Sequence, residues 1–153
     1  MTDPFGVYVH IPFCARRCDY CAFATFTDRH HLQQQYLDAL RADIERADLP
    51  VATSVFVGGG TPTAVDAAAL GEVLRSIRCA PGAEVTVECN PDDVTDELAD
   101  HYAAAGVNRV SIGVQSMVPH VLASLGRHHT PSNVAMAVRS MRRAGIARVN
   151  LDL

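Results

Sequence analysis

The chain has 153 residues, of which 48% are hydrophobic and 20% charged, and its formal net charge at pH 7 is −4. This length is enough for one domain with a buried core, and no basic stripe is available to follow a phosphate backbone, so we expect no nucleic-acid partner. The N-terminus lacks a signal-peptide pattern, and no apolar run approaches the roughly 20 residues that span a bilayer. We therefore expect a cytoplasmic protein with no integral membrane segment.

Short β-branched runs alternate along the chain with stretches of helical periodicity, which is the pattern of βα units and a parallel sheet. The expected strands are Gly6 to Ile11, Ser54 to Val57, Glu84 to Glu88, Arg109 to Val114 and Arg148 to Leu153. The expected helices carry apolar stripes at Leu32, Tyr36, Leu40 and Ile44 and at Leu70, Val73, Leu74 and Ile77, or begin at Thr95, at Ser116 before Pro119 and at Thr130 before Pro131. The predicted class is therefore α/β.

The predicted strands alternate apolar and polar side chains, as Val7, Val9 and Ile11 do with Tyr8 and His10. Parallel strands that are covered on both faces are instead continuous apolar runs. A period of two puts apolar groups against helices on one face and polar groups in a common interior on the other. We predict a partial parallel (β/α) barrel, truncated after the fifth strand. Residues 1–153 would then be one domain, incomplete at its C-terminus and with an open edge.

Polar motifs follow each predicted strand, and the carboxyl ends of parallel strands are where βα folds carry their chemistry. These motifs are a cysteine cluster, Gly58-Gly59-Gly60-Thr61, Glu88-Cys89-Asn90, Gln115-Ser116 and Asp152. The sequence therefore predicts one contiguous site built from five strand ends.

Three cysteines, Cys14, Cys18 and Cys21, follow the first strand directly, and Pro12 stops that strand. Five cysteines in all, three of them clustered, do not suggest a disulfide framework. Three thiolates satisfy three irons of a cubane and leave the fourth without a protein ligand, whereas structural zinc requires a fourth Cys or His. One face of a helix that buries three small side chains is the remaining alternative. The pattern favours an iron-sulfur site.

The run Tyr8-Val9-His10-Ile11-Pro12-Phe13-Cys14, continued as C-x3-C-x2-C, resembles the radical S-adenosylmethionine (SAM) superfamily in its coproporphyrinogen III dehydrogenase-like branch. The resemblance extends through Gly58-Gly59-Gly60-Thr61-Pro62-Thr63, Glu88-Cys89-Asn90-Pro91, Ser111-Ile112-Gly113-Val114-Gln115-Ser116 and Asn150-Leu151-Asp152-Leu153. It implies a radical SAM type of barrel and a 4Fe-4S cluster on the three cysteines. It further implies that the open iron binds SAM, and that one electron, from a donor such as flavodoxin or ferredoxin, splits SAM to methionine and a 5′-deoxyadenosyl radical.

The same resemblance implies a SAM pocket lined by Tyr8, Tyr20, Gly59, Gly60, Thr61, Glu88, Gln115, Arg127 and Asp152. Glycines let a backbone approach a ligand closely, although a plain tight turn is the alternative. Glu88, at an inward strand end, can accept hydrogen bonds from hydroxyls or an ammonium; the alternative is a surface carboxylate. Arg127 is equally compatible with a surface position at a helix end, and the two tyrosines with core packing.

Several further residues have the side chains of metal ligands but lack the spacing. We interpret Cys79 and Cys89 as small buried residues, and His10 as a satisfied interior histidine with substrate contact as the alternative. We predict that the pairs His30-His31 and His128-His129 are solvated cap or loop residues rather than metal ligands.

The residues after the third cysteine, Ala22 and Phe23, separate two activities within the branch. The resemblance implies a fourth cysteine in place of Phe23 in members that decarboxylate coproporphyrinogen III. This chain therefore resembles the haem-chaperone type of the branch, which implies haem as a ligand of the whole protein. Porphyrinogen oxidation is the alternative, and a non-catalytic metal-binding module is the alternative from another class. An assay of SAM cleavage separates that module from an enzyme.

Overall fold

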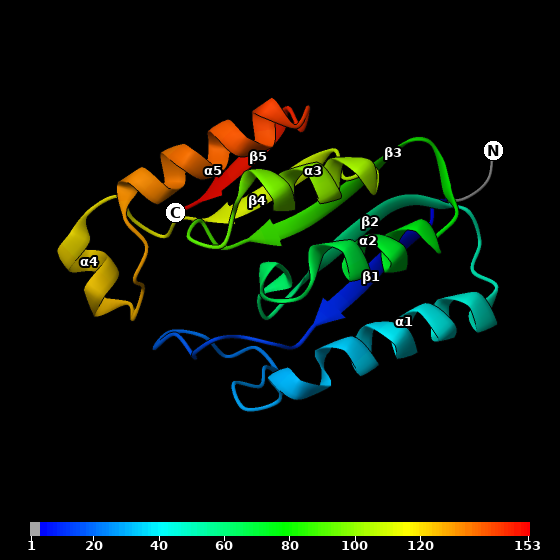
Figure 1. Ribbon diagram of the computed structural model, residues 1–153, viewed down its shortest axis with the longest axis horizontal. Coiled ribbons are helices and arrows are strands. Elements are labelled where there is room, and N and C mark those ends of the chain that lie inside the picture. The colour runs from blue at the N-terminus through cyan, green and yellow to red at the C-terminus, as the bar shows by residue number, and fades with distance from the viewer. Residues whose placement is uncertain (1–3) are drawn as a thin grey trace.

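A computed structural model describes residues 4–153 as one sheet of five parallel strands in the order β1-β2-β3-β4-β5 (Figure 1). The strands are β1 Gly6–Ile11, β2 Ala52–Gly59, β3 Cys79–Cys89, β4 Arg109–Gly113 and β5 Arg148–Asp152. The helices are α1 Gln33–Ala47, α2 Ala67–Arg75, α3 Asp96–Ala104, α4 Pro119–Ser124 and α5 Pro131–Arg143, with 3₁₀ turns at His30–Leu32 and Pro62–Ala64. Each strand pairs with the next one along the chain, so all five carboxyl ends meet at one edge.

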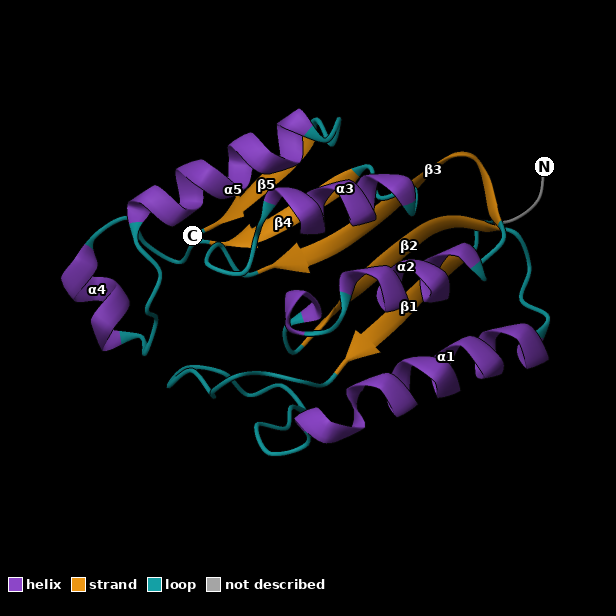
Figure 2. Cartoon of the chain, viewed as in Figure 1, coloured by secondary structure: helices purple, strands orange, loops and turns teal. Residues whose placement is uncertain are grey.

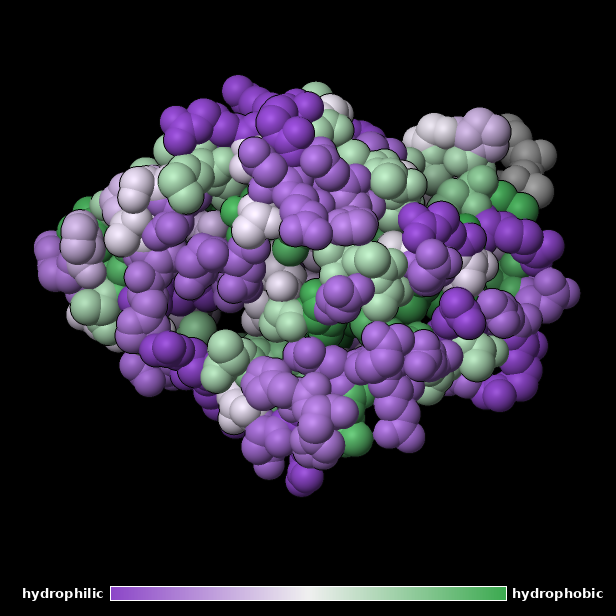
Figure 3. Space-filling model, in the orientation of Figure 1, coloured by the Kyte–Doolittle hydropathy of each residue, from purple (hydrophilic) through white to green (hydrophobic). Residues whose placement is uncertain are grey.

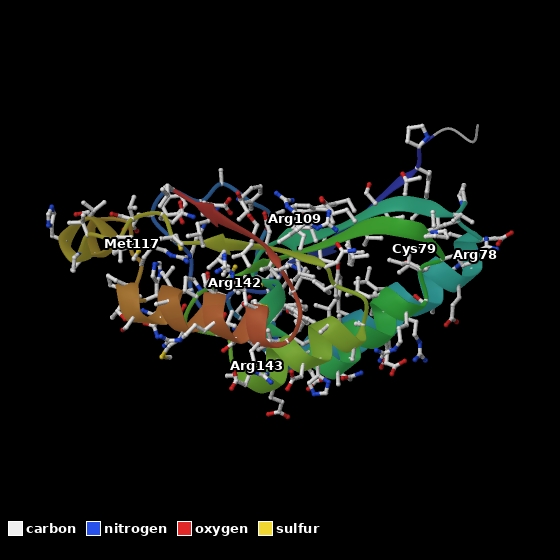
Figure 4. The ribbon with its side chains drawn as sticks, turned by 90° about the horizontal axis from the view of Figure 1, so that it is seen from above. Arg78, Cys79, Arg109, Met117, Arg142 and Arg143 are labelled. Atoms are coloured by element: carbon white, nitrogen blue, oxygen red, sulfur yellow. The ribbon has the colours of Figure 1, made fainter. Side chains whose placement is uncertain are left out.

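The helices α1, α2, α3 and α5 all cover the same face of the sheet (Figure 2). Figure 4, seen at right angles, shows the sheet above this helix layer, with Arg109 on the open side and Arg143 on the helix side. Within residues 4–153 the open face carries no helix. The predicted α/β partial barrel is confirmed. No helix of the described residues combines the length and apolar character that a membrane crossing requires.

The predicted alternation along the strands sets the two faces apart. The side chains buried against the helices include Val9, Ile11, Val55, Val57, Val87, Val110 and Ile112. On the opposite face Thr86 and Ser111 are buried as well, but each has a carboxylate partner, Glu84 for Thr86 and Asp152 for Ser111. Such hydrogen bonds offset the free-energy cost of removing a hydroxyl from water. The outer surface of the helix layer is mostly hydrophilic, with apolar patches between the helices (Figure 3).

Two of the predicted helix starts are confirmed in detail. Thr95 accepts a hydrogen bond from the Leu98 amide at 3.1 Å, and Thr130 forms a capping box with Asn133. These caps satisfy backbone N–H groups that a first helical turn leaves without partners. The helix predicted from Ser116 begins instead at Pro119, because a proline suits the first helical position.

Cys79 is exposed, so the prediction that it is buried was wrong. Strand β3 begins five residues before the predicted start at Glu84, and its first residue pairs with Ala52 while Glu84 pairs with Ser54. The intervening residues of β3 therefore loop out at the amino end of the sheet, where Gly82 has a φ of 79°. The prediction for Cys89 is confirmed, since that thiol is buried among core residues.

Two methionines of α5 test the packing of the helix layer on the sheet. Met141 is fully buried, whereas Met136, five residues earlier, is 47% exposed. We expect Met141→Ala to lower the free energy of unfolding by about 2–5 kcal/mol through a lost contact and a residual cavity. The matched control Met136→Ala should stay within about 0.5 kcal/mol. Urea unfolding followed by circular dichroism measures both, and equal losses would contradict the described orientation of α5.

Candidate functional site

A cavity of about 260 Å³ lies at the carboxyl ends of the strands. Its lining includes the three clustered cysteines and every predicted SAM residue except Tyr8, namely Cys14, Cys18, Cys21, Tyr20, Gly59, Gly60, Thr61, Glu88, Gln115, Arg127 and Asp152. Segments more than 100 residues apart in the sequence thus meet in one place, as the parallel order of the strands requires. The strand-end residues that the sequence analysis grouped together therefore line one cavity.

The cysteine loop leaves β1 at Pro12 and returns beside it at Phe26. The Cys14 amide donates to the Phe26 carbonyl at 3.1 Å, and the Phe26 amide donates to the Pro12 carbonyl at 2.7 Å. Within the loop, the Cys21 amide donates to the Cys18 carbonyl and closes a turn. The loop is therefore a closed structure pinned at its base rather than a free strand end.

The glycine-rich turn after β2 packs directly on the base of this loop. The Gly60 amide donates to the Ile11 carbonyl at 2.7 Å, and the Thr61 amide donates to the Phe13 carbonyl at 2.8 Å. A Cβ at Gly60 would lie 2.7 Å from both carbonyl oxygens, which is closer than any real side chain stands. Only glycine permits this approach of two backbones.

Two of the three clustered thiols have hydrogen-bond donors. The Thr61 hydroxyl donates to Cys14 Sγ at 3.3 Å, and Arg127 Nη1 donates to Cys18 Sγ at 3.8 Å. Burial raises the pKa of the Cys14 thiol, and the Thr61 hydrogen bond opposes that rise. In the described part of the chain, no three Cys, His, Asp or Glu side chains converge on the position of a single metal ion. A cubane requires no such convergence, because each thiolate binds a different iron.

Two carboxylates and a strained backbone form the inner wall of the cavity. Burial raises the pKa of Glu88, the Gly59 amide donating to it at 3.3 Å opposes the rise, and the negative charge of Asp152 adds to it. Asp152 accepts from the Ser111 hydroxyl at 2.9 Å. Gln115 has a φ of 60°, a left-handed conformation that costs a non-glycine residue energy. Its backbone N–H donates to the Asp152 carbonyl at 2.7 Å.

Arg127 points into the cavity from the segment after α4. Its Nη2 donates to Asn90 Oδ1 at 2.9 Å and to the Gly113 carbonyl at 2.7 Å. These partners, together with Cys18, come from three other parts of the chain. The alternative of a surface arginine at a helix end is therefore excluded.

Neither tyrosine is a core residue, since Tyr8 is 57% and Tyr20 49% exposed. Tyr8 lies outside the cavity lining on the open face of the sheet, where its ring stacks on Phe56 with the centroids 6.2 Å apart. Its hydroxyl bonds His10 Nδ1 at 3.0 Å, and His10 Nε2 donates to the Ala24 carbonyl at 3.0 Å. Both ring nitrogens of His10 thus have partners, as predicted, but the residue is half-buried rather than interior, and it ties the far end of the cysteine loop to β1.

The prediction of solvated histidines was wrong for His129, of which only 4% is exposed. Its Nε2 donates to the Val114 carbonyl at 2.9 Å, so the ring anchors this segment to the end of β4. His128 is exposed and accepts a hydrogen bond from Arg16 of the cysteine loop. His30 and His31 are exposed, as predicted.

A small polar group at the cavity wall was given no role by the sequence analysis, which did not single out Asp93. Asp93 accepts a hydrogen bond from the Thr63 hydroxyl at 2.8 Å, and that hydroxyl accepts one from the backbone N–H of Asn90 at 3.3 Å. Burial raises the pKa of the Asp93 carboxyl, which the Thr63 hydrogen bond opposes. The available signal was position alone, because all three residues lie just after strands, where a site was expected.

Comparison with known proteins agrees with this geometry. The sequence profile described as "Radical SAM superfamily" matches residues 8–152. The haem chaperone HemW of Mycobacterium tuberculosis H37Rv is 43% identical over 162 residues, which cover 99% of this chain and 42% of that protein. The HemW of Escherichia coli K12 is 35% identical over 98% of this chain and 42% of that protein. The chain therefore spans about two fifths of the length of these relatives.

Among solved structures, the coproporphyrinogen III oxidase HemN of Escherichia coli, described as a radical SAM enzyme, superposes with a TM-score of 0.86. It is 33% identical in sequence, and the match covers 98% of this chain and 37% of that one. The likeness thus extends over the sheet, the cysteine loop and the α4–α5 segment together.

Proposed function

This chain belongs to the radical SAM superfamily, and we propose that it holds a 4Fe-4S cluster and SAM in its strand-end cavity, as part of a cytoplasmic haem chaperone. One observation carries the proposal: the three clustered cysteines, the glycine turn and the two strand-end carboxylates line the same cavity. The haem-binding part of the proposal concerns the whole protein. This chain spans about two fifths of the length of the HemW relatives.

The chemistry of the donor set fits such a cluster. Three partly buried sulfurs are available, and a hydroxyl and a guanidinium already donate to two of them. Hydrogen bonds to sulfur are a usual means of stabilising thiolate ligands. We assign the three ligand positions to Cys14, Cys18 and Cys21. A bound cluster supplies the electron that cleaves SAM reductively, and a flavodoxin or ferredoxin is the proposed source of that electron.

The remaining residues of the cavity suit the polar parts of SAM. Glu88 and Asp152 provide acceptors for ribose hydroxyls and an ammonium, whereas Arg127 provides donors for a carboxylate. The turn at Gly59 and Gly60 lets a ligand approach the backbone without meeting a side chain. Gln115 is held in a strained conformation whose cost is consistent with a binding role.

The position after the third cysteine supports the chaperone over the oxidase. Phe23 lies in the cavity wall, 65% exposed, and contributes an aromatic face where a further thiol would mark the decarboxylating type. The 43% identity to a HemW supports the same assignment. Porphyrinogen oxidation is the second candidate, because the fold also superposes on HemN with a TM-score of 0.86.

The cysteine assignment can be tested by reconstitution. We expect the anaerobically reconstituted protein to bind about four irons and four sulfides per chain, as a cubane requires. Alanine at Cys14, Cys18 or Cys21 should each abolish the cluster, measured by iron, acid-labile sulfide and visible absorption. Cys89→Ala, a thiol at the same edge but buried in the core, is the matched control and should leave the cluster intact. Tightly bound zinc without sulfide would refute the assignment.

Glu88 should give SAM binding a pH dependence. Its pKa is raised mainly by burial, so the ionised acceptor is present above that raised value and is lost as the pH falls through it. SAM affinity should therefore weaken on acidification, beginning above the ordinary carboxyl pKa. Glu88→Gln should remove this dependence and cost about 1–3 kcal/mol, or roughly 5- to 150-fold in affinity, by calorimetric titration.

The matched control for this experiment is Glu84→Gln. Glu84 lies on the same face of β3, but it pairs with Arg109 and Arg148 at the amino end of the sheet. Its replacement should leave the pH profile of SAM binding unchanged. An unaltered profile in Glu88→Gln would show that another group controls binding.

The choice between chaperone and oxidase is decided with the full-length protein. We expect it to bind haem and cleave SAM slowly, but not to convert coproporphyrinogen III to protoporphyrinogen IX. The assay is anaerobic incubation with SAM and a reductant, followed by porphyrin chromatography. Turnover would favour the oxidase; a cluster without any SAM cleavage would favour a non-catalytic metal-binding module. Phe23→Cys should not create turnover, because one thiol supplies none of the substrate contacts.

A further inference from the structure

The short helix α4 ends in a motif that turns the chain back toward the cysteine loop. The Gly126 amide donates to the Ala123 carbonyl at 3.1 Å, and the Arg127 amide donates to the Leu122 carbonyl at 2.9 Å. With Gly126 at a φ of 68°, this is a Schellman motif. This motif fixes the direction of the chain after Gly126, so that the next residue, Arg127, enters the cavity.

The segment Gly126 to His129 contacts the cysteine loop at successive positions. A Cβ at Gly126 would lie 3.3 Å from the Asp19 carboxylate, and Arg16 donates to His128. Between these contacts, Arg127 reaches Cys18. The buried ring of His129 anchors the segment from below through its bond to β4, so these contacts have a fixed base.

Among the described residues, the hydrogen-bond partners of Arg127 include no carboxylate. Its Nη2 hydrogen bonds go to two neutral oxygens, the Asn90 side chain and the Gly113 carbonyl. Its Nη1 bond goes to sulfur, and its Nε is buried with no partner among the described residues. The Asp93 carboxyl lines the same cavity without a hydrogen bond to this half-buried guanidinium; burial raises its pKa, and the charge of Arg127 opposes that rise. A guanidinium that donates a hydrogen bond to a sulfur stabilises negative charge on that sulfur.

We propose that Arg127 sets the reduction potential of the cluster by donating a charge-assisted hydrogen bond to the Cys18 thiolate, with Asn90 as its positioning residue. This inference rests on the proposed function, because it requires a cluster on Cys18. Reduction adds one electron, taken from an external donor, to the cluster and its thiolates. A neighbouring cation stabilises this more negative state more than the oxidised state, so it raises the potential.

The neutral Asn90 is an essential part of the inference. Its Oδ1 accepts from the same nitrogen that bonds Gly113, which orients the guanidinium so that Nη1 is directed at Cys18. An aspartate of nearly the same shape would keep the acceptor and would place a negative charge in direct contact with the guanidinium. A role in packing alone predicts little change from such a substitution, whereas an electrostatic role predicts a lower potential.

The test is a potentiometric titration of the full-length protein, reconstituted anaerobically and followed by electron paramagnetic resonance of the reduced cluster. Iron and sulfide are counted first. In Arg127→Gln the ratio of reduced to oxidised cluster at a fixed potential should fall about tenfold, equivalent to about 59 mV for one electron. Asn90→Asp should shift the potential in the same direction, and Arg127→Lys, which keeps the charge, should shift it less.

Arg142→Gln is the matched control, because this arginine of α5 is exposed and the chemical change is identical. Its potential should equal that of the unmodified protein. A cluster that loads normally but keeps its potential in both Arg127→Gln and Asn90→Asp would overturn the inference. If Arg127→Gln fails to fold, the Asn90→Asp result decides alone. Absence of iron and sulfide from the unmodified protein would instead refute the proposed function.

Discussion

The amides of Gly60 and Thr61 donate to the carbonyls of Ile11 and Phe13, and the arrangement of the site depends on these two hydrogen bonds. They continue the pairing of β1 with β2 past Gly59, the last residue of β2. The cysteine loop therefore starts from a position fixed by the sheet. The contact requires a residue without a side chain at position 60, because a Cβ there would collide with backbone oxygens. The Thr61 hydroxyl then reaches Cys14 from the same turn, so one backbone contact also positions a donor to sulfur.

The parts of this structure that could be predicted from sequence are those governed by local rules. A period of two identified the face of each strand, since a β-branched residue at position 9 or 11 packs against helices while its neighbours cannot. The caps at Thr95 and Thr130 were predictable because a side-chain oxygen satisfies amides only three residues away. The common edge of the strand ends followed from parallel topology alone. It was sufficient to bring the cysteines, Glu88 and Asp152 to one cavity.

Residues whose environment is made by distant segments could not be predicted in this way. His129 has an ordinary loop sequence around it, and its burial comes from the end of β4, which the β4–α5 connection folds over. Cys79 was misjudged for the opposite reason. Its strand begins early and loops out at the amino end of the sheet, where the pairing with β2 shifts register. Arg127 was ambiguous in sequence, because a helix end directs an arginine to solvent unless a glycine reverses the chain, and only the structure shows what the reversal meets.

Charge is distributed unevenly across the cavity, and this follows from the topology. Glu88 and Asp152 belong to the ends of β3 and β5, while the guanidinium of Arg127 enters from the connection between β4 and α5 and stands beside the cysteine loop. The carboxyl of Glu88 has a raised pKa in this setting, because burial and the charge of Asp152 outweigh the single amide of Gly59. A ligand with a cationic group toward the carboxylates and an anionic group toward Arg127 would relieve both imbalances at once. This distribution supports the proposal of a zwitterionic ligand whose cationic group faces the carboxylates and whose anionic group faces Arg127.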